Sequence, residues 1–289
     1  MKNYKYIWML PVTVFLLFTS CSDDDYLGGH ATTDGAGVLM TVTAQINAQT
    51  NPTLAWQAND VIGIATSYGL YDATSRNREY VCQSDGKTFA QRAGYPIYVK
   101  GAATIVGYWP FSGTDGAEPT LALDTRDQSN VTEYLFAKAE NVTPQDGGSV
   151  SLVFDYALAQ LQLNFTTPAS EQIKSFRLTG LAQQAAVDPY TLDMTLDAPE
   201  DLSQSGANIQ STTLKLIPQT VGADAVVPVQ LVLIGTFRSY TIHMGELELK
   251  AGSVVTANVN VTDGIGSVDF IPGGSVWENS GAGGDVTSK

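Results

Sequence analysis

Residues 38–46 read VLMTVTAQI, and this short run already indicates a β-protein. Apolar side chains stand at every second position, and from Thr41 onward polar side chains fill the positions between them. Successive side chains of a strand point to opposite faces, so the run predicts a strand that is buried on one face. The side chains expected on that face are Val38, Met40, Val42, Ala44 and Ile46.

Strand-like runs recur along the rest of the chain. Glycine, aspartate and proline separate them, and no stretch shows the apolar period of a helix. Many short strands with this punctuation are typical of β-sandwiches, so we expect an all-β fold of antiparallel sheets. The further runs are residues 61–65, 98–108, 150–154, 161–165, 174–178, 214–217, 227–234, 240–244 and 255–261.

The segment from residue 152 to residue 165 changes its alternation part of the way along. A pleated strand cannot move its apolar side chains to the other face without an extra residue. We therefore expect a bulge or a short turn within residues 157–160. The apolar residues of one parity are Leu152, Phe154, Tyr156 and Leu158, and those of the other are Leu161, Leu163 and Phe165.

A glycine-containing turn at residues 144–149 divides the runs into two sets of similar size. Each set is long enough to bury a core of its own. We expect an N-terminal β-sandwich over residues 38–147 and a C-terminal β-sandwich over residues 148–264. Residues 265–289 then form a glycine-rich tail with two short apolar patches.

The first 20 residues predict a secretory signal peptide. Two lysines precede an apolar run over residues 7–18, which is shorter than the span a membrane-crossing helix needs. The run ends in Thr19-Ser20-Cys21, which resembles a bacterial lipobox and predicts a lipid on Cys21. Three aspartates follow, and we expect residues 21–37 to be an acidic, glycine-containing tether.

The composition excludes several classes of partner. The 289 residues carry a formal net charge of −14, and only 15% of them are charged. A protein that binds nucleic-acid phosphates needs a basic face, so we expect no nucleic-acid partner. An acidic surface is also repelled by anionic lipid headgroups, so the lipid on Cys21 would provide the membrane anchor.

Nothing in the sequence indicates catalysis, a metal or a cofactor. The chain has two histidines and two cysteines, and the usual nucleophile, zinc and phosphate-binding motifs are missing from the sequence. We interpret His243 as a structural strand residue and Cys82 as a small buried one. Carboxylates are plentiful, and the two catalytic carboxylates of a glycosidase need not be close in sequence, so a glycosidase site stays open. We expect a protein that is not an enzyme.

Three tryptophans, Trp56, Trp109 and Trp277, allow two interpretations. They could stack on sugar rings as an exposed platform, or they could pack in the core. Aromatic residues of strands and turns pack in cores more often, so we favour the core.

Six motifs resemble, in their order, those of the fimbrillin-like proteins of Bacteroidetes. The first is a W-x-x-x-D-x-I-G-I element that starts at Trp56. In the third and fourth motifs Tyr134 replaces the family's usual acidic residue, and Tyr156 and Gln160 replace its histidine and lysine. The motifs are LAWQANDVIGI (residues 54–64), GYWPF (107–111), YLFA (134–137), FDYALAQL (154–161), LIPQ (216–219) and LKAG (249–252).

The resemblance implies two tandem transthyretin-like antiparallel β-sandwich domains and a role in cell-surface fimbriae at the outer membrane. It implies other fimbrial subunits as partners, and a host or bacterial surface ligand is a further candidate. Members that polymerise lose their first strand to a protease, and a strand of the next subunit fills the groove. The first strand, residues 38–46, is therefore the candidate exchange strand, and we expect it at a sheet margin. The candidate donor residues are Val268, Phe270, Ile271, Val276 and Trp277.

One departure from the family concerns processing. The chain has no lysine or arginine between Lys5 and Arg76, and cleavage at Arg76 or Arg78 would remove more than one strand. The resemblance then leaves a stalk, tip or anchor position open. A different function, a surface glycan-binding lipoprotein that does not polymerise, predicts an exposed aromatic platform with polar groups around it.

Overall fold

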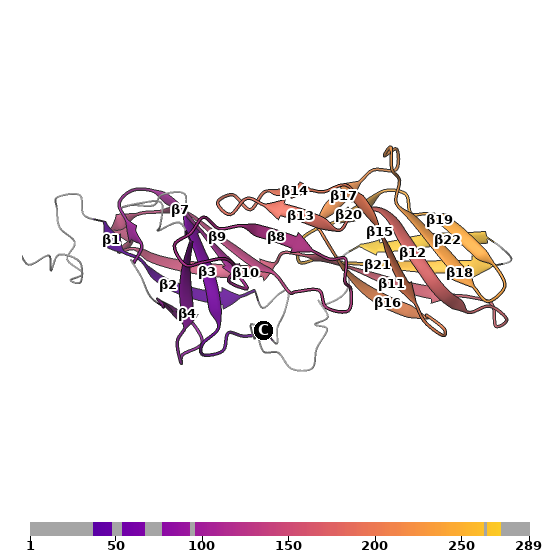
Figure 1. Ribbon diagram of the computed structural model, residues 1–289, viewed down its shortest axis with the longest axis horizontal. Helices are drawn as coiled ribbons and strands as arrows, with labels where there is room; N and C mark the ends of the chain where they lie inside the picture. Colours follow the sequence, from indigo (N-terminus) through magenta and orange to yellow (C-terminus); the bar gives the residue numbers. More distant parts are fainter. Residues whose placement is uncertain (1–36, 48–53, 67–76, 93–95, 263–264, 273–289) are drawn as a thin grey trace, which may run out of the picture. The chain divides into compact units, whose positions relative to one another are not determined.

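The computed structural model describes residues 37–47, 54–66, 77–92, 96–262 and 265–272. The expected signal peptide, the lipidated Cys21 and the tether up to residue 36 lie outside these ranges. The described part consists of β-strands and one short 3₁₀ turn, Pro144–Asp146, which confirms the all-β expectation (Figure 1). In these ranges no helix is long and apolar enough to cross a membrane.

Seven strands of the first half close into a barrel in the order β10-β2-β5-β4-β3-β7-β9. This differs from the open antiparallel sandwich that the sequence predicted. A closed ring with an odd number of strands cannot alternate direction all the way round, and here β2 and β10 run parallel. The strands are β2 (Thr41–Ile46), β3 (Val61–Thr66), β4 (Asn77–Cys82), β5 (Thr88–Gln91), β7 (Ala103–Trp109), β9 (Leu135–Val142) and β10 (Ser149–Tyr156).

Two four-stranded sheets form the second half, in the orders β16-β11-β21-β22 and β15-β12-β18-β19. Their inward side chains share one apolar core. The pairing is antiparallel except between β11 and β21, which run parallel. The strands are β11 (Ala159–Thr166), β12 (Ile173–Ala182), β15 (Pro199–Ser205), β16 (Ser211–Leu216), β18 (Gln230–Gly235), β19 (Ser239–His243), β21 (Val254–Thr262) and β22 (Ile265–Pro272).

Three small sheets complete the part of the chain that the structure describes. In one of them β8 of the first half pairs with β13 of the second, so Ala185 and Val187 join the first core. The small sheets are β1 (Val38–Leu39) with β6 (Tyr98–Val99), β8 (Leu121–Asp124) with β13 (Gln184–Val187) and β14 (Met194–Leu196), and β17 (Gln219–Val221) with β20 (Leu247–Leu249).

The two halves repeat one order of strands. The first half contains two runs of neighbouring strands, β10-β2-β5 and β4-β3-β7-β9. The second half contains the corresponding runs β21-β11-β16 and β15-β12-β18-β19. Each half also has its first and last repeated strands in parallel. The first half closes because β5 pairs with β4 and β9 with β10. Among the described residues of the second half, β16 does not pair with β15 and β19 does not pair with β21. β22 instead pairs with the edge of β21.

Strand pairing corrects the expected boundary at residues 147–148. β10 was expected to begin the second sandwich, but it pairs with β2 and β9 in the barrel. The chain leaves the barrel only at Ala157 and Leu158, which are both buried. The predicted break within residues 157–160 is therefore confirmed. Its cause is that β10 packs into the first core and β11 into the second, so that the buried face changes between them.

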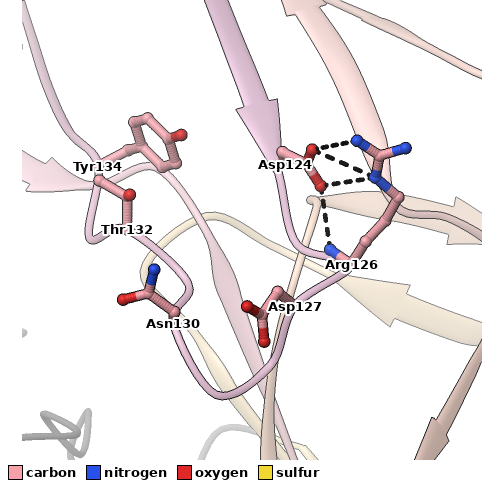
Figure 2. A pocket seen from close by; sticks show the side chains of 6 residues that line it. All are labelled: Asp124, Arg126, Asp127, Asn130, Thr132 and Tyr134. Carbon is pink, nitrogen blue, oxygen red and sulfur yellow. Dashed lines mark hydrogen bonds and ion pairs between the residues drawn. The ribbon is translucent and has the colours of Figure 1, made fainter.

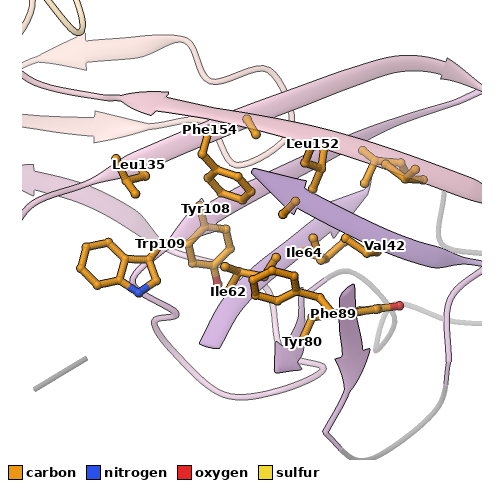
Figure 3. Packing of buried hydrophobic residues seen from close by; sticks show 14 of the residues in the cluster. Val42, Ile62, Ile64, Tyr80, Phe89, Tyr108, Trp109, Leu135, Leu152 and Phe154 are labelled. Carbon is orange, nitrogen blue, oxygen red and sulfur yellow. The ribbon is translucent and has the colours of Figure 1, made fainter. Parts of the chain in front are cut away.

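Large apolar side chains pack inside the barrel. Trp56 lies edge-on to Phe89 and Phe154, with ring centroids 5.4 and 5.1 Å apart. Figure 3 shows the ring of Tyr108 of β7 near those of Phe89 and Phe154. Its hydroxyl oxygen is 2.6 Å from Oδ1 of the buried Asn77. The side chain of Tyr108 covers Gly63 of β3 so closely that a Cβ at this position would overlap its Cζ, Cε1 and hydroxyl oxygen atoms.

Candidate functional site

The predicted exchange strand is placed differently from the sequence expectation. Residues 38–46 form two strands, β1 and β2, and β1 pairs with β6. β2 does not lie at a sheet margin: β10 pairs with it on one side and β5 on the other. In a closed barrel every strand has a neighbour on each side, so β2 has no free edge.

The side chains of β2 alternate as predicted. Val42, Ala44 and Ile46 are buried, and the other three residues of the strand, Thr41, Thr43 and Gln45, are exposed. Met40, in the link between β1 and β2, is buried as well, whereas Val38 lies in β1 and is half-buried. The barrel core therefore receives three side chains from β2.

Most of the pairing along β10 comes from β2. Residues Ser149 to Phe154 are opposite Thr41 to Ile46, while β9 pairs only with Asp155 and Tyr156. On the other side Val42 is opposite Phe89 of β5. Without β2 the main-chain groups of β10 would lose their partner strand, and a slot would open between β10 and β5.

Main-chain bonds hold β2 in this slot. The amide of Thr41 donates to the carbonyl oxygen of Gly148 at 3.0 Å, and the amide of Ala44 donates to that of Lys87 at 2.9 Å. At the end of the strand the amide of Asn47 donates to the Phe154 carbonyl at 2.9 Å. Since these bonds involve only backbone atoms of β2, any strand with the same direction and alternation could make them.

The candidate donor residues lie partly in β22. This strand pairs with β21 from Ile265 to Pro272, so the second half does not end at residue 264 as expected. Val268 and Phe270 are half-buried against the second core, whereas Ile271 is 50% exposed. Val276 and Trp277 lie outside the described residues. The apolar residues of β22 thus have a partner strand within their own chain.

Two of the three tryptophans do not form a sugar-stacking platform. Trp56 and Trp109 are only 4% and 7% exposed, as the core interpretation predicted. Their indole N–H groups have no hydrogen-bond partner among the described residues. Trp277 lies outside that part of the chain.

Arg78 is not available to a protease in the folded chain. Its side chain lies in β4, is 4% exposed and forms an ion pair with Asp115 at 3.2 Å. Asp115 also accepts a hydrogen bond from the amide of Glu79 at 3.0 Å. Arg76 lies outside the described residues.

A polar pocket of about 280 Å³ lies in the loop that joins β8 to β9 (Figure 2). Sequence reasoning missed it, although the loop is unusually rich in polar residues. Arg126 makes an ion pair with Asp124 at 2.6 Å, and its hydrogen bonds lower the pKa of that carboxyl group. Burial raises the pKa of the Tyr134 hydroxyl. The lining residues are Asp124, Arg126, Asp127, Asn130, Thr132 and Tyr134.

Metal-ligating residues do not gather in the described ranges, where no group of three or more His, Cys, Asp or Glu side chains could hold an ion. Cys82 lies in β4 of the barrel and His243 in β19 of the second half, and these two strands do not pair with one another.

The thiol of Cys82 is expected to be unreactive in the folded protein. Cys82 is 2% exposed, and burial raises the pKa of its thiol to about 11. The reactive thiolate is therefore scarce at pH 8. Iodoacetamide at pH 8, followed by peptide mapping, should label Cys82 slowly in the native chain and rapidly in urea. Equal labelling in both states would contradict the burial.

Comparison with known proteins gives a consistent result. Residues 43–275 match the family model described as Fimbrillin-like. Among curated proteins none matches the chain significantly. The chain is similar to the crystal structure of a candidate cell adhesion protein from Bacteroides ovatus, with 19% identity, a TM-score of 0.59 and coverage of 84% of this chain and 100% of that one. A similar structure from Bacteroides uniformis has 16% identity, a TM-score of 0.55 and coverage of 83% and 98%. At these identities the likeness concerns the fold.

Proposed function

Because the chain belongs to the fimbrillin-like family, as its motifs predicted, we propose that it is a structural or anchor subunit of cell-surface fimbriae that assembles by β-strand exchange. The observation that carries the proposal is the position of β2 between β10 and β5. Withdrawal of this one strand opens a slot that only another strand can fill completely.

A donated strand would be held by backbone bonds and by burial. It would run parallel to β10, replace the bonds of β2 and place alternate side chains where Val42, Ala44 and Ile46 now lie. Fully burying an aliphatic side chain is worth roughly 1.5–3 kcal/mol. Two or three such side chains, added to the main-chain bonds, give tight and register-specific binding.

We propose β22 and the residues after it as the donor. β22 has no counterpart in the repeated strand order of the first half, so its removal leaves the seven repeated strands of the second half in place. Its inward positions are Gly266, Val268 and Phe270, which alternate as a donor requires. Donation from one subunit to the next is a head-to-tail contact, which produces a filament.

The proposal includes two tandem transthyretin-like domains. Their shared strand order supports a division after Tyr156, with β22 included in the second domain. The predicted lipid on Cys21 would hold the subunit at the outer membrane. The burial of Arg78 argues against a trypsin-like cut at this residue, so that either another protease acts before β2 or the subunit stays lipidated as an anchor.

Separation of β2 after folding tests the proposal. A protease site engineered into residues 48–53 of a Cys21→Ser chain allows the link after β2 to be cut. We expect the cut chain to exchange β2 for a labelled peptide of residues 38–47 and, without the peptide, to form oligomers in size-exclusion chromatography. The uncut chain and a Val42→Asp, Ala44→Asp peptide are the controls. A cut chain that neither binds the peptide nor oligomerises would refute strand exchange through β2.

Deletion of residues 267–289 then identifies the donor. We expect this variant to lose surface filaments and oligomer ladders while its slot still accepts the peptide of residues 38–47. Unchanged assembly would exclude the tail as donor and leave the exchange site itself intact.

A further inference from the structure

The loop that forms the polar pocket is held in place by bonds at its start and in its middle. Arg126 and Gln184 both donate hydrogen bonds to the Asp124 carboxylate, at 2.6 and 3.2 Å for the shortest contacts. In the middle of the loop the side chain of Gln128 accepts a bond from the amide of Lys215 and donates one to its carbonyl oxygen, at 3.0 and 2.8 Å. A pocket on such a loop is preorganised, so a ligand would have little ordering cost to overcome.

Polar groups remain available inside this fixed loop. Asp127 is exposed, and its Oδ1 atom accepts bonds from the amide and the hydroxyl of Ser129. The side-chain amide of Asn130 has no hydrogen-bond partner among the described residues, and Asn130 is exposed. Thr132 adds an exposed hydroxyl, which also forms a hydrogen bond with the side chain of Tyr134.

One aromatic ring borders the same space. Tyr134 is half-buried and packs with one side against the first core. Figure 2 shows the Tyr134 ring and Asp127 on different sides of the pocket, and in this view Asp124 lies between the ring and the guanidinium group of Arg126. The pocket therefore presents an aromatic ring, a carboxylate, an amide and a hydroxyl.

We propose that this pocket binds a neutral sugar ring at the end of a glycan. Neighbouring sugar hydroxyls both donate and accept hydrogen bonds, which carboxylate and amide side chains can satisfy, and the apolar face of the ring can lie on Tyr134. The volume of about 280 Å³ is at the small end of ligand pockets, which suits one ring. Two carboxylates in the lining and a net charge of −14 disfavour an anionic ligand.

The test uses the full chain and saturation-transfer NMR. The probes are the methyl glycosides of galactose, glucose, mannose and N-acetylglucosamine, with N-acetylneuraminic acid as the anion and spermidine as the cation. We expect saturable binding of at least one neutral glycoside. Asn130→Ala and Thr132→Val should each weaken it about tenfold, which corresponds to the loss of a hydrogen bond to the ligand.

The matched control is Asn208→Ala, which removes an exposed loop asparagine outside the pocket and should leave binding unchanged. Unfolding curves of the variants establish that each is folded. The proposal is overturned if no neutral glycoside binds saturably, if only the charged probes bind, or if both pocket variants bind as the unaltered chain does. None of these outcomes depends on whether strands are exchanged through β2.

Discussion

Replacing Gly63 by alanine should lower the free energy of unfolding by about 3 kcal/mol, because the new Cβ would overlap the Cζ, Cε1 and hydroxyl oxygen atoms of Tyr108. The ring cannot move aside freely, since its hydroxyl oxygen lies 2.6 Å from Asn77 Oδ1 and 3.1 Å from the carbonyl oxygen of Ser112. Relief of the overlap must therefore break a buried hydrogen bond or separate β3 from β7. Urea unfolding followed by tryptophan fluorescence measures the loss.

The matched control is Gly101→Ala, since a Cβ at Gly101 meets nothing within 4 Å. A glycine-to-alanine change at a compatible position alters stability by less than about 1 kcal/mol and often raises it. Equal stability of the two variants would show that Tyr108 does not occupy the space over Gly63.

Replacing Lys215 by methionine should destabilise the protein by about 3 kcal/mol, because the change leaves a carboxylate without its charge partner in a desolvated position. The side chain of Lys215 is 8% exposed, and its ammonium group forms an ion pair with Glu133, which is 23% exposed. The loop between β8 and β9 is joined to β16 by this pair and by the bonds of Gln128. Urea unfolding again provides the measurement.

A second ion pair provides the control for this effect. Lys250 and Glu248 are 69% and 54% exposed, so Lys250→Met should cost less than about 1 kcal/mol. Adding Glu133→Gln to Lys215→Met should restore part of the lost stability, because the carboxylate is then no longer charged. If Lys215→Met costs no more than Lys250→Met, the buried pair contributes nothing beyond an exposed one.

Local patterns in the sequence were sufficient to predict individual strands but not the way in which the sheets close. The alternation of Val42, Ala44 and Ile46 and the break after Tyr156 depend on neighbouring residues, and both are confirmed. The position of β2 between β10 and β5 depends on pairings with residues far along the chain, which alternation does not specify. The turn at residues 144–149 resembles a domain boundary locally, yet β10 returns to the barrel after it.

The pocket shows the same limitation. Its lining residues all lie between positions 124 and 134, so one short stretch of the sequence contains them, but polar loops are common and indicate only solvent exposure. The pocket itself depends on Arg126 closing onto Asp124 and on Gln128 reaching Lys215, a residue of β16. A single sequence carries no local signal for such contacts.

The parallel pairs β2–β10 and β11–β21 have a consequence for the time course of folding. The hydrogen bond from Asn47 to Asp155 joins residues 108 positions apart, and the bond from Asn164 to Asn258 joins residues 94 apart. Contacts of such long sequence separation require large loops to close first and slow the folding of a domain. Each half can complete its sheet only when its last repeated strand has joined it. The first strand of each half therefore stays without its principal partner until the end of that half has folded.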